Sequence, residues 1–478
     1  GYSSAASDVY KRQDLYAAKK TYGQDINTSL GNAADPIDAD QKLQEDALMS
    51  YVASVNYSYG DKYYASFSFR RDGSSRLSPD TRWGNFWSLS ASWRLSQEKF
   101  MQSLKSVLSD LKLRASYGVN GNLPSSYYGY QSTYTTGAFY NGKPSPWEST
   151  LGNEELTWEK NYALNLGLDI GLFSRVNVSL DWYTRTTKDL LMSKQLNSIS
   201  GFSSLLTNVG QMRNTGVELE VRSNNIKTKD FSWTTAFNLS HNKNKILKLA
   251  DLPWFVDGRY VRKEGYPFNT IYLREYAGVD PETGSALYYD NQQDENGNYT
   301  KNKVTDPGQA SPIPLKDITP TISGGFMNTF NYKFIDLSFN LSYSFGGYSY
   351  DNASYILQDD GYSVISNKST EQRRRWQKPG DITDVPRFVY GNKKGGNYNS
   401  SRAIHSTDHI RLKSLILGLN APKAWLQKLG IGNARIYFSG TNLLTWAAYD
   451  QYDPEMSGVV GFYTPPLKTY AFGLELKF

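Results

Sequence analysis

Large apolar residues alternate with small or polar residues over long stretches of this chain. In the segment 50–59, tyrosine, alanine and valine occupy the odd positions, and serine or asparagine fills most even positions. Successive side chains of a β-strand point to opposite faces, so this period of two predicts strands with one apolar and one polar face. The pattern recurs in about thirteen segments, which predicts an all-β chain. Its further apolar rows lie in 63–69, 87–95, 111–117, 162–168, 176–182, 217–221, 231–239, 319–332, 337–345, 409–419, 432–440 and 470–478.

The connections between these expected strands alternate in length. Short connections are expected at 60–61, 96–109, 171–175, 223–230, near 333, and at 420–431, and long ones at 71–85, 118–157, 184–213, 241–317, 346–407 and 441–467. An up-and-down barrel in an outer membrane has short turns on one side and long loops on the other. A soluble sandwich has no reason to follow that rule. The alternation therefore predicts an antiparallel up-and-down transmembrane β-barrel, with apolar rows facing lipid and polar rows facing the lumen.

Two segments depart from this simple pattern. Residues 409–419 are apolar at both odd and even positions, so we expect this strand to pack on its inner as well as its outer face. Residues 1–45 are polar, and we expect an irregular segment with one strand at most, followed by barrel over 46–478. Gly1–Gln13 resembles translated adapter sequence and is a candidate for foreign origin. Bacterial single-chain barrels have an even number of strands, so an odd count predicts at least one further strand upstream.

Composition narrows the function classes. Hydrophobic residues make up 39% of the chain and the mean hydropathy is -0.57, too polar for a helical membrane protein. The basic residues are dispersed and the net charge is only +6, which argues against nucleic acid as a partner. Cysteine is absent and there are three histidines, so thiolate chemistry is excluded and a metal site is not expected. The 37 tyrosines and 11 tryptophans suit either a membrane–water boundary or a sugar-binding surface.

Short motifs follow one another from about residue 46 to the end of the chain. They are Arg71–Arg76, Arg82–Trp87, Leu156–Lys160, Asn165–Phe173, Thr187–Leu191, Asn214–Leu219, Arg375–Thr383, Arg411–Lys413, Ser439–Thr445, Tyr452–Glu455 and the terminal Phe478. In this order they resemble the SusC/RagA-type TonB-linked outer-membrane proteins, a family that imports nutrients, often glycans. No single motif is specific; their order and spacing carry the resemblance.

The resemblance implies an integral outer-membrane protein of a Gram-negative bacterium. Of a 22-strand family barrel, the chain would supply roughly 13–14 strands, with the plug, the TonB-contacting segment and the early strands absent. Without them, this chain alone would not perform coupled transport. The implied partners are a SusD-like surface lipoprotein, the TonB–ExbB–ExbD system, the barrel-assembly machinery and outer-membrane lipid or lipopolysaccharide. The assembly machinery would recognise the C-terminal strand through Tyr470, Phe472, Leu474, Leu476 and Phe478.

Aromatic clusters in two long connections are the candidates for substrate contact. One cluster contains Tyr127, Tyr128, Tyr130 and Tyr134, and the other contains Trp254, Phe255 and Tyr260. Flat aromatic faces stack on sugar rings, and neighbouring Asn and Asp side chains can bond hydroxyl groups. The same residues could equally pack the loops or seat a partner protein.

Other motifs have weaker claims. Asp453-Pro-Glu455 could supply paired carboxylates but is more typical of a turn. The acidic segment 290–297 lacks the spacing of a calcium loop. The basic run Arg373–Arg375 suits solvent or lipopolysaccharide. We expect no cofactor, no metal and no catalytic residue. The alternatives to import are a glycan-binding or adhesion barrel without transport and, less favoured, an outer-membrane hydrolase, since no Gly-x-Ser-x-Gly motif accompanies the histidines.

Overall fold

The computed structural model describes residues 2–22, 33–249, 252–392, 399–426 and 430–478. Within these ranges the chain consists mostly of antiparallel strands, as the alternating pattern predicts. Fourteen strands form one large sheet in the order β1-β2-β3-β4-β5-β8-β9-β12-β13-β21-β22-β25-β26-β28. Each strand of this sheet pairs with the next one along the chain, which is the up-and-down order. The all-β antiparallel fold class is confirmed.

The strands of the large sheet are long. Their bounds are β1 Tyr2–Tyr22, β2 Ala33–Tyr59, β3 Tyr63–Ser74, β4 Trp83–Arg94, β5 Leu108–Asn122, β8 Glu159–Leu172, β9 Val176–Lys188, β12 Gln211–Lys227, β13 Phe231–Lys248, β21 Ile322–Tyr332, β22 Ile335–Phe345, β25 His409–Asn420, β26 Asn433–Ala447 and β28 Thr469–Lys477.

Smaller elements occupy the connections. The short strands are β6 Thr133–Tyr140, β7 Lys143–Thr150, β10 Leu191–Gln195, β11 Ser204–Asn208, β14 Trp254–Asp257, β15 Tyr260–Lys263, β16 Thr270–Leu273, β17 Tyr276–Val279, β18 Ala286–Tyr289, β19 Lys303–Val304, β20 Ile313–Asp317, β23 Tyr348–Asp351, β24 Ile404–Ser406 and β27 Gly458–Val460. The helices are α1 Asn352–Leu357, α2 Lys423–Leu426 and the 3-10 turns Leu95–Gln97, Lys99–Leu104, Ser198–Ser200, Pro307–Gln309, Thr370–Arg374 and Ser401–Ala403. Of the helices in the described ranges, none has the length and apolar character needed to cross a membrane.

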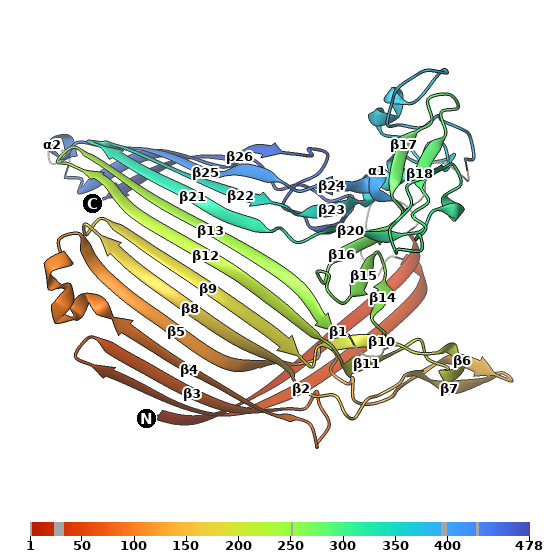
Figure 1. Cartoon of the computed structure of the whole chain (residues 1–478), viewed down its shortest axis with the longest axis horizontal. Helices are drawn as coiled ribbons and strands as arrows, with labels where there is room; N and C mark the ends of the chain where they lie inside the picture. Colours follow the sequence, from red (N-terminus) through yellow and green to blue (C-terminus); the bar gives the residue numbers. More distant parts are fainter. Residues whose placement is uncertain (1, 23–32, 250–251, 393–398, 427–429) are drawn as a thin grey trace. The chain divides into compact units, whose positions relative to one another are not determined.

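The chain divides into two compact units. Unit 1 comprises Gly1–Trp93, Arg114–Asn165 and Arg185–Met212, and unit 2 comprises Arg94–Leu113, Leu166–Thr184 and Arg213–Phe478. In unit 2, strands β12, β13, β21, β22 and β25 run side by side (Figure 1). Helix α2 lies at one end of these strands, and β14–β18 and α1 lie at the other.

The predicted alternation of short and long connections is present. The short ones are 60–62, 95–107, 173–175, 228–230, 333–334 and 421–432, and the long ones are 75–82, 123–158, 189–210, 249–321, 346–408 and 448–468. The segment 75–82 is an exception, because β3 and β4 extend further than their apolar rows and leave a connection shorter than 95–107. In the other connections the long segments carry the small sheets and α1, whereas the short segments 95–107 and 421–432 carry two 3-10 turns and α2. A ligand site built on the small sheets therefore belongs to the long connections.

The two faces of the strands differ as predicted. On β3, Tyr63, Phe67 and Phe69 form an exposed apolar row. On the other face, the hydroxyl of Ser68 lies 2.7 Å from that of its cross-strand partner Ser88. Polar groups thus bond one another across the strands, while large apolar side chains face the surroundings. An exposed apolar surface of this extent is typical of a face that contacts lipid.

The C-terminal strand β28 carries the row that the sequence indicates. Phe472 pairs with Phe438 of β26, with their ring centroids 5.3 Å apart. The exposed fractions along the row are high because no strand covers its other side within the described residues. The row consists of Tyr470, Phe472, Leu474 and Leu476, with Phe478 just after the strand. Its role in assembly stays a prediction.

Strand β25 packs on its inner face, as expected, but does so through polar side chains at its start. Its register against β22 and β26 shifts at Lys413, which is the signature of a β-bulge. The extra residue moves the exposed apolar row from even to odd positions, so Ile410, Leu417 and Leu419 are all exposed. His409 and Arg411 are buried on the opposite face. The bulge explains why the sequence of this strand is apolar at both odd and even positions.

The N-terminal residues are more regular than their sequence suggests. Where we expected an irregular segment over 1–45 with one strand at most, β1 and β2 form an antiparallel ladder from Tyr2↔Ser54 to Tyr22↔Ala33, with a register shift between Ala18 and Lys19. Main-chain hydrogen bonds hold this ladder. Because such bonds do not depend on the side chains, a polar sequence can form these strands without alternating apolar and polar residues. The origin of Gly1–Gln13 stays a prediction.

Several of the family-like motifs meet in one loop core of unit 1. Leu77, Leu156 and Trp158 are buried there with Phe86 and Val119. The indole N–H of Trp158 donates to the carbonyl of Arg82 at 2.8 Å. These motif residues therefore hold the long connections on the ends of the strands, and their contacts are structural.

Candidate ligand-binding site

A four-stranded sheet within the connection 249–321 forms the base of the candidate site. Its strand order is β14-β15-β16-β20, entirely within unit 2. On one face, Ile271 and Leu273 of β16 are buried against Tyr350 and Ala403. Side chains alternate along a strand, so the residue between Ile271 and Leu273 on β16, and the residues of β14 and β15 that share its face, point to the opposite side of the sheet.

That second face carries an aromatic and cationic surface. Trp254 of β14 lies directly opposite Lys263 of β15, and such cross-strand partners stand side by side on one face. Tyr272 of β16 lies opposite Pro314 of β20. The indole of Trp254 and the phenol of Tyr272 have centroids 6.0 Å apart and an interplanar angle of 50°. Trp254 remains 45% exposed, so its ring is available to a ligand.

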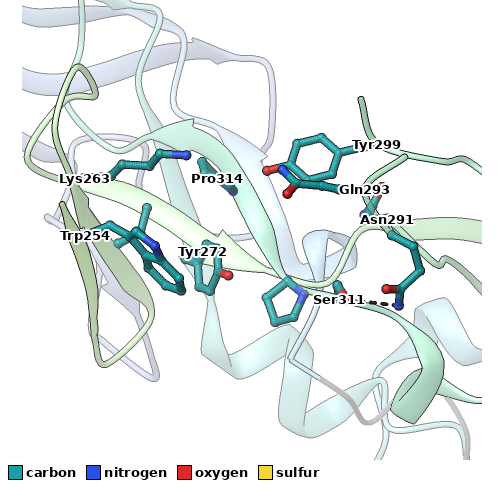
Figure 2. A pocket seen from close by; sticks show the side chains of 11 residues that line it. Trp254, Lys263, Tyr272, Asn291, Gln293, Tyr299, Ser311 and Pro314 are labelled. Atoms are coloured by element: carbon teal, nitrogen blue, oxygen red, sulfur yellow. Dashed lines mark hydrogen bonds between the residues drawn. The ribbon is translucent and has the colours of Figure 1, made fainter. Parts of the chain in front are cut away.

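The opposing wall is the segment 291–299, between β18 and β19. Figure 2 shows Gln293 and Tyr299 facing the strands that carry Trp254 and Tyr272. The amide of Gln292 donates to the hydroxyl of Ser311 at 3.3 Å, which ties this wall to the start of β20. Three amide side chains, at positions 291–293, thus border the site.

An Asx turn holds this wall in place. The carboxylate of Asp294 accepts the main-chain N–H groups of Asn296 and Asn298 at 2.9 and 2.8 Å. The Asn298 N–H in particular holds the pKa of the Asp294 carboxyl below its usual value. Among the residues that the structure describes, no cluster of three or more His, Cys, Asp or Glu side chains could hold a metal ion. The acidic segment 290–297 is a hydrogen-bonded turn.

The two walls enclose a cavity of about 460 Å³. This volume lies within the range of ~300–1,000 Å³ typical of small-molecule sites. Its lining combines three aromatic rings, two of them phenols, with three amides, one serine hydroxyl and one ammonium group, together with Val261, Pro312 and Pro314. Burial raises the pKa of the Tyr272 hydroxyl, so that this group remains a neutral hydrogen-bonding group. The arrangement suits a flat, polyhydroxylated ring held by stacking and hydrogen bonds.

The second predicted aromatic cluster divides between two faces. Trp254 lines the cavity. Phe255 lies opposite Arg262 on the other face of the hairpin, and Tyr260 packs against the core formed around Ile271 and Tyr350. The structure thus brings one of the three residues to the cavity, and substrate contact by any of them stays a prediction.

The four predicted tyrosines belong to unit 1 and do not line this cavity. The guanidinium of Arg76 lies over the ring of Tyr127, 4.2 Å from its centroid. The Tyr128 hydroxyl accepts the main-chain N–H of Glu45 at 3.2 Å. Tyr130 packs against the loop core, while Tyr134 on β6 is 65% exposed. The first three side chains contact other parts of the chain. Substrate contact by any of the four tyrosines stays a prediction.

The cavity contains residues that the sequence did not single out. Lys263, Tyr272 and Tyr299 belong to short elements inside a long connection, where four-residue strands give no measurable period. The run Asn291-Gln292-Gln293 was the one available signal, because clustered amides suit hydroxyl ligands.

The carboxylates of Asp453 and Glu455 form ion pairs with side chains of β25. Arg411, buried in β25, donates from Nη2 to Asp453 Oδ1 and from Nη1 to Glu455 Oε2, both at 2.8 Å. Lys413 Nζ reaches the same Glu455 carboxylate at 2.6 Å. Two motifs that are far apart in the sequence therefore neutralise each other, and this arrangement is structural.

The histidines and the basic run are also engaged within the chain. His241 and His409 each bond a main-chain carbonyl, and the His405 ring stacks on Tyr449 at 3.7 Å. None of these three contacts involves a serine hydroxyl. In the run 373–375, Arg374 pairs with Glu371 at 2.6 Å. Contact of this run with lipopolysaccharide stays a prediction.

Comparison with known proteins gives concordant matches. A family model described as "TonB dependent receptor-like, beta-barrel" matches residues 3–308. The TonB-dependent receptor P3 of Formosa agariphila is 33% identical over 471 residues, which cover 91% of this chain and 46% of that protein. The TonB-dependent receptor SusC of Bacteroides thetaiotaomicron is 30% identical over 475 residues, covering 92% of this chain and 45% of SusC. The chain thus spans about half the length of the curated relatives it matches.

Solved structures give the same result. A chain of the RagAB peptide importer in its closed-closed state superposes with a TM-score of 0.87 and 30% sequence identity, over 99% of this chain and 53% of that chain. The open-open state gives a TM-score of 0.87 at 29% identity. These relatives are receptors and transporters, not enzymes.

Proposed function

Because the chain belongs to the TonB-dependent receptor β-barrel family, we propose that it is part of an outer-membrane nutrient importer of the SusC type. The protein is then integral to the outer membrane of a Gram-negative bacterium, with its exposed apolar rows against lipid. The observation that carries the proposal is the cavity of about 460 Å³ among the long connections, since an importer needs a ligand site outside its strands. The substrate class is a glycan or a product of glycan or peptide breakdown.

The proposed mechanism divides the work between this chain and its partners. Ligand binds among the long connections, against rings such as Trp254 and Tyr272. A SusD-like lipoprotein covers the loaded site, as the family resemblance implies. The TonB–ExbB–ExbD system then pulls on a plug to open the path inward. This chain's residues perform no bond-breaking step; they bind, orient and enclose the ligand.

Uptake by cells that carry the full-length gene tests the proposal. Labelled nutrient glycans and peptides should accumulate in the wild type and should fail to accumulate when TonB is removed. Trp254→Ala should reduce uptake, because it removes the largest stacking surface of the cavity. Trp425→Ala is the control, since Trp425 is also an exposed tryptophan of unit 2 but belongs to α2, at the other end of the strands. Surface binding of a glycan without TonB-dependent uptake would instead support an adhesion barrel.

A further inference from the structure

Resting on the proposed function, we infer that the cavity between β14–β16 and the segment 291–299 binds an anionic saccharide. The acid group, a carboxylate or a sulfate ester on the sugar, pairs with Lys263. The sugar ring stacks against Trp254 and bonds the Gln293 amide of the opposing wall. Charge, ring chemistry and geometry each support this assignment.

The charge of the cavity is unbalanced. Of the described residues that line it, Lys263 alone carries a formal charge. Its ammonium group lies 5.1 Å from the ring centroid of Tyr266, a contact that leaves the positive charge uncompensated. An anion of the ligand would supply the missing charge-assisted hydrogen bond.

Three acidic groups near the cavity are engaged, and Asp294 and Glu295 of the segment 291–299 do not line it. Asp257 pairs with Arg262 on the other face of the hairpin, at 2.9 Å. Glu264 accepts the main-chain N–H of Leu249 at 2.8 Å. Glu275, which lies near the wall residue Asn291, pairs with Lys301. The positive charge at Lys263 therefore faces the cavity without a competing carboxylate at its lining.

The remaining lining favours a sugar over a peptide. A peptide held by its main chain adds a strand to a sheet edge. Here the ligand-facing surface is the face of the β14–β16 sheet, with Trp254 and Tyr272 standing on it (Figure 2). Rings on one wall and the Gln293 amide on the other match a ring that has an apolar face and hydroxyls at its edge. The Asn291 amide is buried and already bonds Glu275 and Lys301.

A glycan array probed with the full-length protein tests the assignment. The array carries uronate-containing and sulfated oligosaccharides beside neutral oligosaccharides of similar size. The wild type should bind anionic members preferentially, and added salt should weaken that binding because the interaction is partly exposed. Lys263→Gln should weaken anionic binding by roughly tenfold or more, and Lys263→Arg should retain it.

Lys316→Gln is the matched control. Lys316 belongs to β20 of the same sheet and lies 5.0 Å from the Tyr348 ring centroid, so it has the same type of contact, but it does not line the cavity. This variant should bind as the wild type does. Binding of sulfated but not uronate members, or the reverse, would identify the acid group. Preference for neutral glycans, an equal effect of both Gln variants, or no binding on the array would overturn the inference.

Uptake distinguishes this inference from the proposed function. TonB-dependent uptake of a neutral glycan or a peptide would overturn the anionic assignment and leave the importer intact. Anionic binding that depends on Lys263 but is never followed by uptake would overturn the importer and leave the assignment of the cavity.

Discussion

The phenol ring of Tyr437 on β26 lies over Gly473 on β28, its direct cross-strand partner. A methyl group at position 473 would overlap this ring. The same arrangement recurs in unit 2, where Tyr343 covers its cross-strand partner Gly324. Both glycines provide space for a ring. Gly473 does so on the polar face of the sheet, where it joins the C-terminal strand to its neighbour, and Gly324 does so on the apolar face, in the row that contains Tyr343.

The Tyr437–Gly473 contact predicts that Gly473→Val weakens the docking of β28. The added side chain displaces the ring, and overpacking of this kind costs about 1–3 kcal/mol. Thermal unfolding of the full-length protein in detergent should show a lower midpoint. The control is Ala471→Val, two residues earlier on the same face, where the partner is Ser439 and no ring lies opposite. Equal midpoints for the two variants would contradict the prediction.

Removing Phe478 should impair assembly and leave ligand specificity unchanged. Its side chain is 87% exposed, so its loss costs little packing within the chain. Its effect should come from recognition of the terminal aromatic by the barrel-assembly machinery. The measurement is the amount of folded protein in the outer membrane, and Phe478→Tyr should behave as the wild type. Normal assembly of the deletion variant would contradict this role of Phe478.

Asp360→Asn should loosen the connection 346–408. Asp360 is fully buried and binds Arg402 through both carboxylate oxygens. Asn tolerates the left-handed backbone at this position (φ 51) but leaves the buried guanidinium uncompensated, at a cost of about 3–5 kcal/mol. Faster hydrogen exchange in this connection would report the change. Glu371→Gln, which breaks an exposed pair with Arg374, should cost about 0–1 kcal/mol, and a similar effect of both variants would count against the role of burial.

Acidic pH should destabilise the region around β24. Burial lowers the pKa of the His405 imidazole below its ordinary 6.5, and among the residues that the structure describes its Nε2 has no hydrogen-bond partner. The unfolded segment therefore binds a proton more readily than the folded one. The stability due to neutral His405 is complete above pH 6.5 and is lost as the pH falls below that value.

His405→Phe isolates this effect, since a phenyl ring can keep the stack on Tyr449 without titrating. Hydrogen exchange of β24, compared at neutral and mildly acidic pH, should accelerate in the wild type and stay constant in His405→Phe. His241→Gln, which alters an exposed histidine, serves as the control. An identical acid response in wild type and His405→Phe would show that another group is responsible.

Prediction from sequence succeeded where one strand carries enough residues to show its period. The row Phe472, Leu474 and Leu476 is an example, because each side chain's face follows from its position alone. The alternation did not show the bulge at Lys413 in β25, which shifts the pattern by one residue. A bulge is a property of two paired strands, and one sequence does not record the register of its partner.

The amino-acid sequence by itself determined the strands, the alternation of their connections and the family, because periodicity and motif order are local properties of a chain. Only the tertiary structure decided which loop residues meet. Trp254 and Phe255 are adjacent in sequence, yet strand geometry sends one to the cavity and the other to the opposite face. Lys263 joins Trp254 through cross-strand pairing, and Tyr299 reaches the same cavity from another element. Such contacts depend on the register and packing of separate strands.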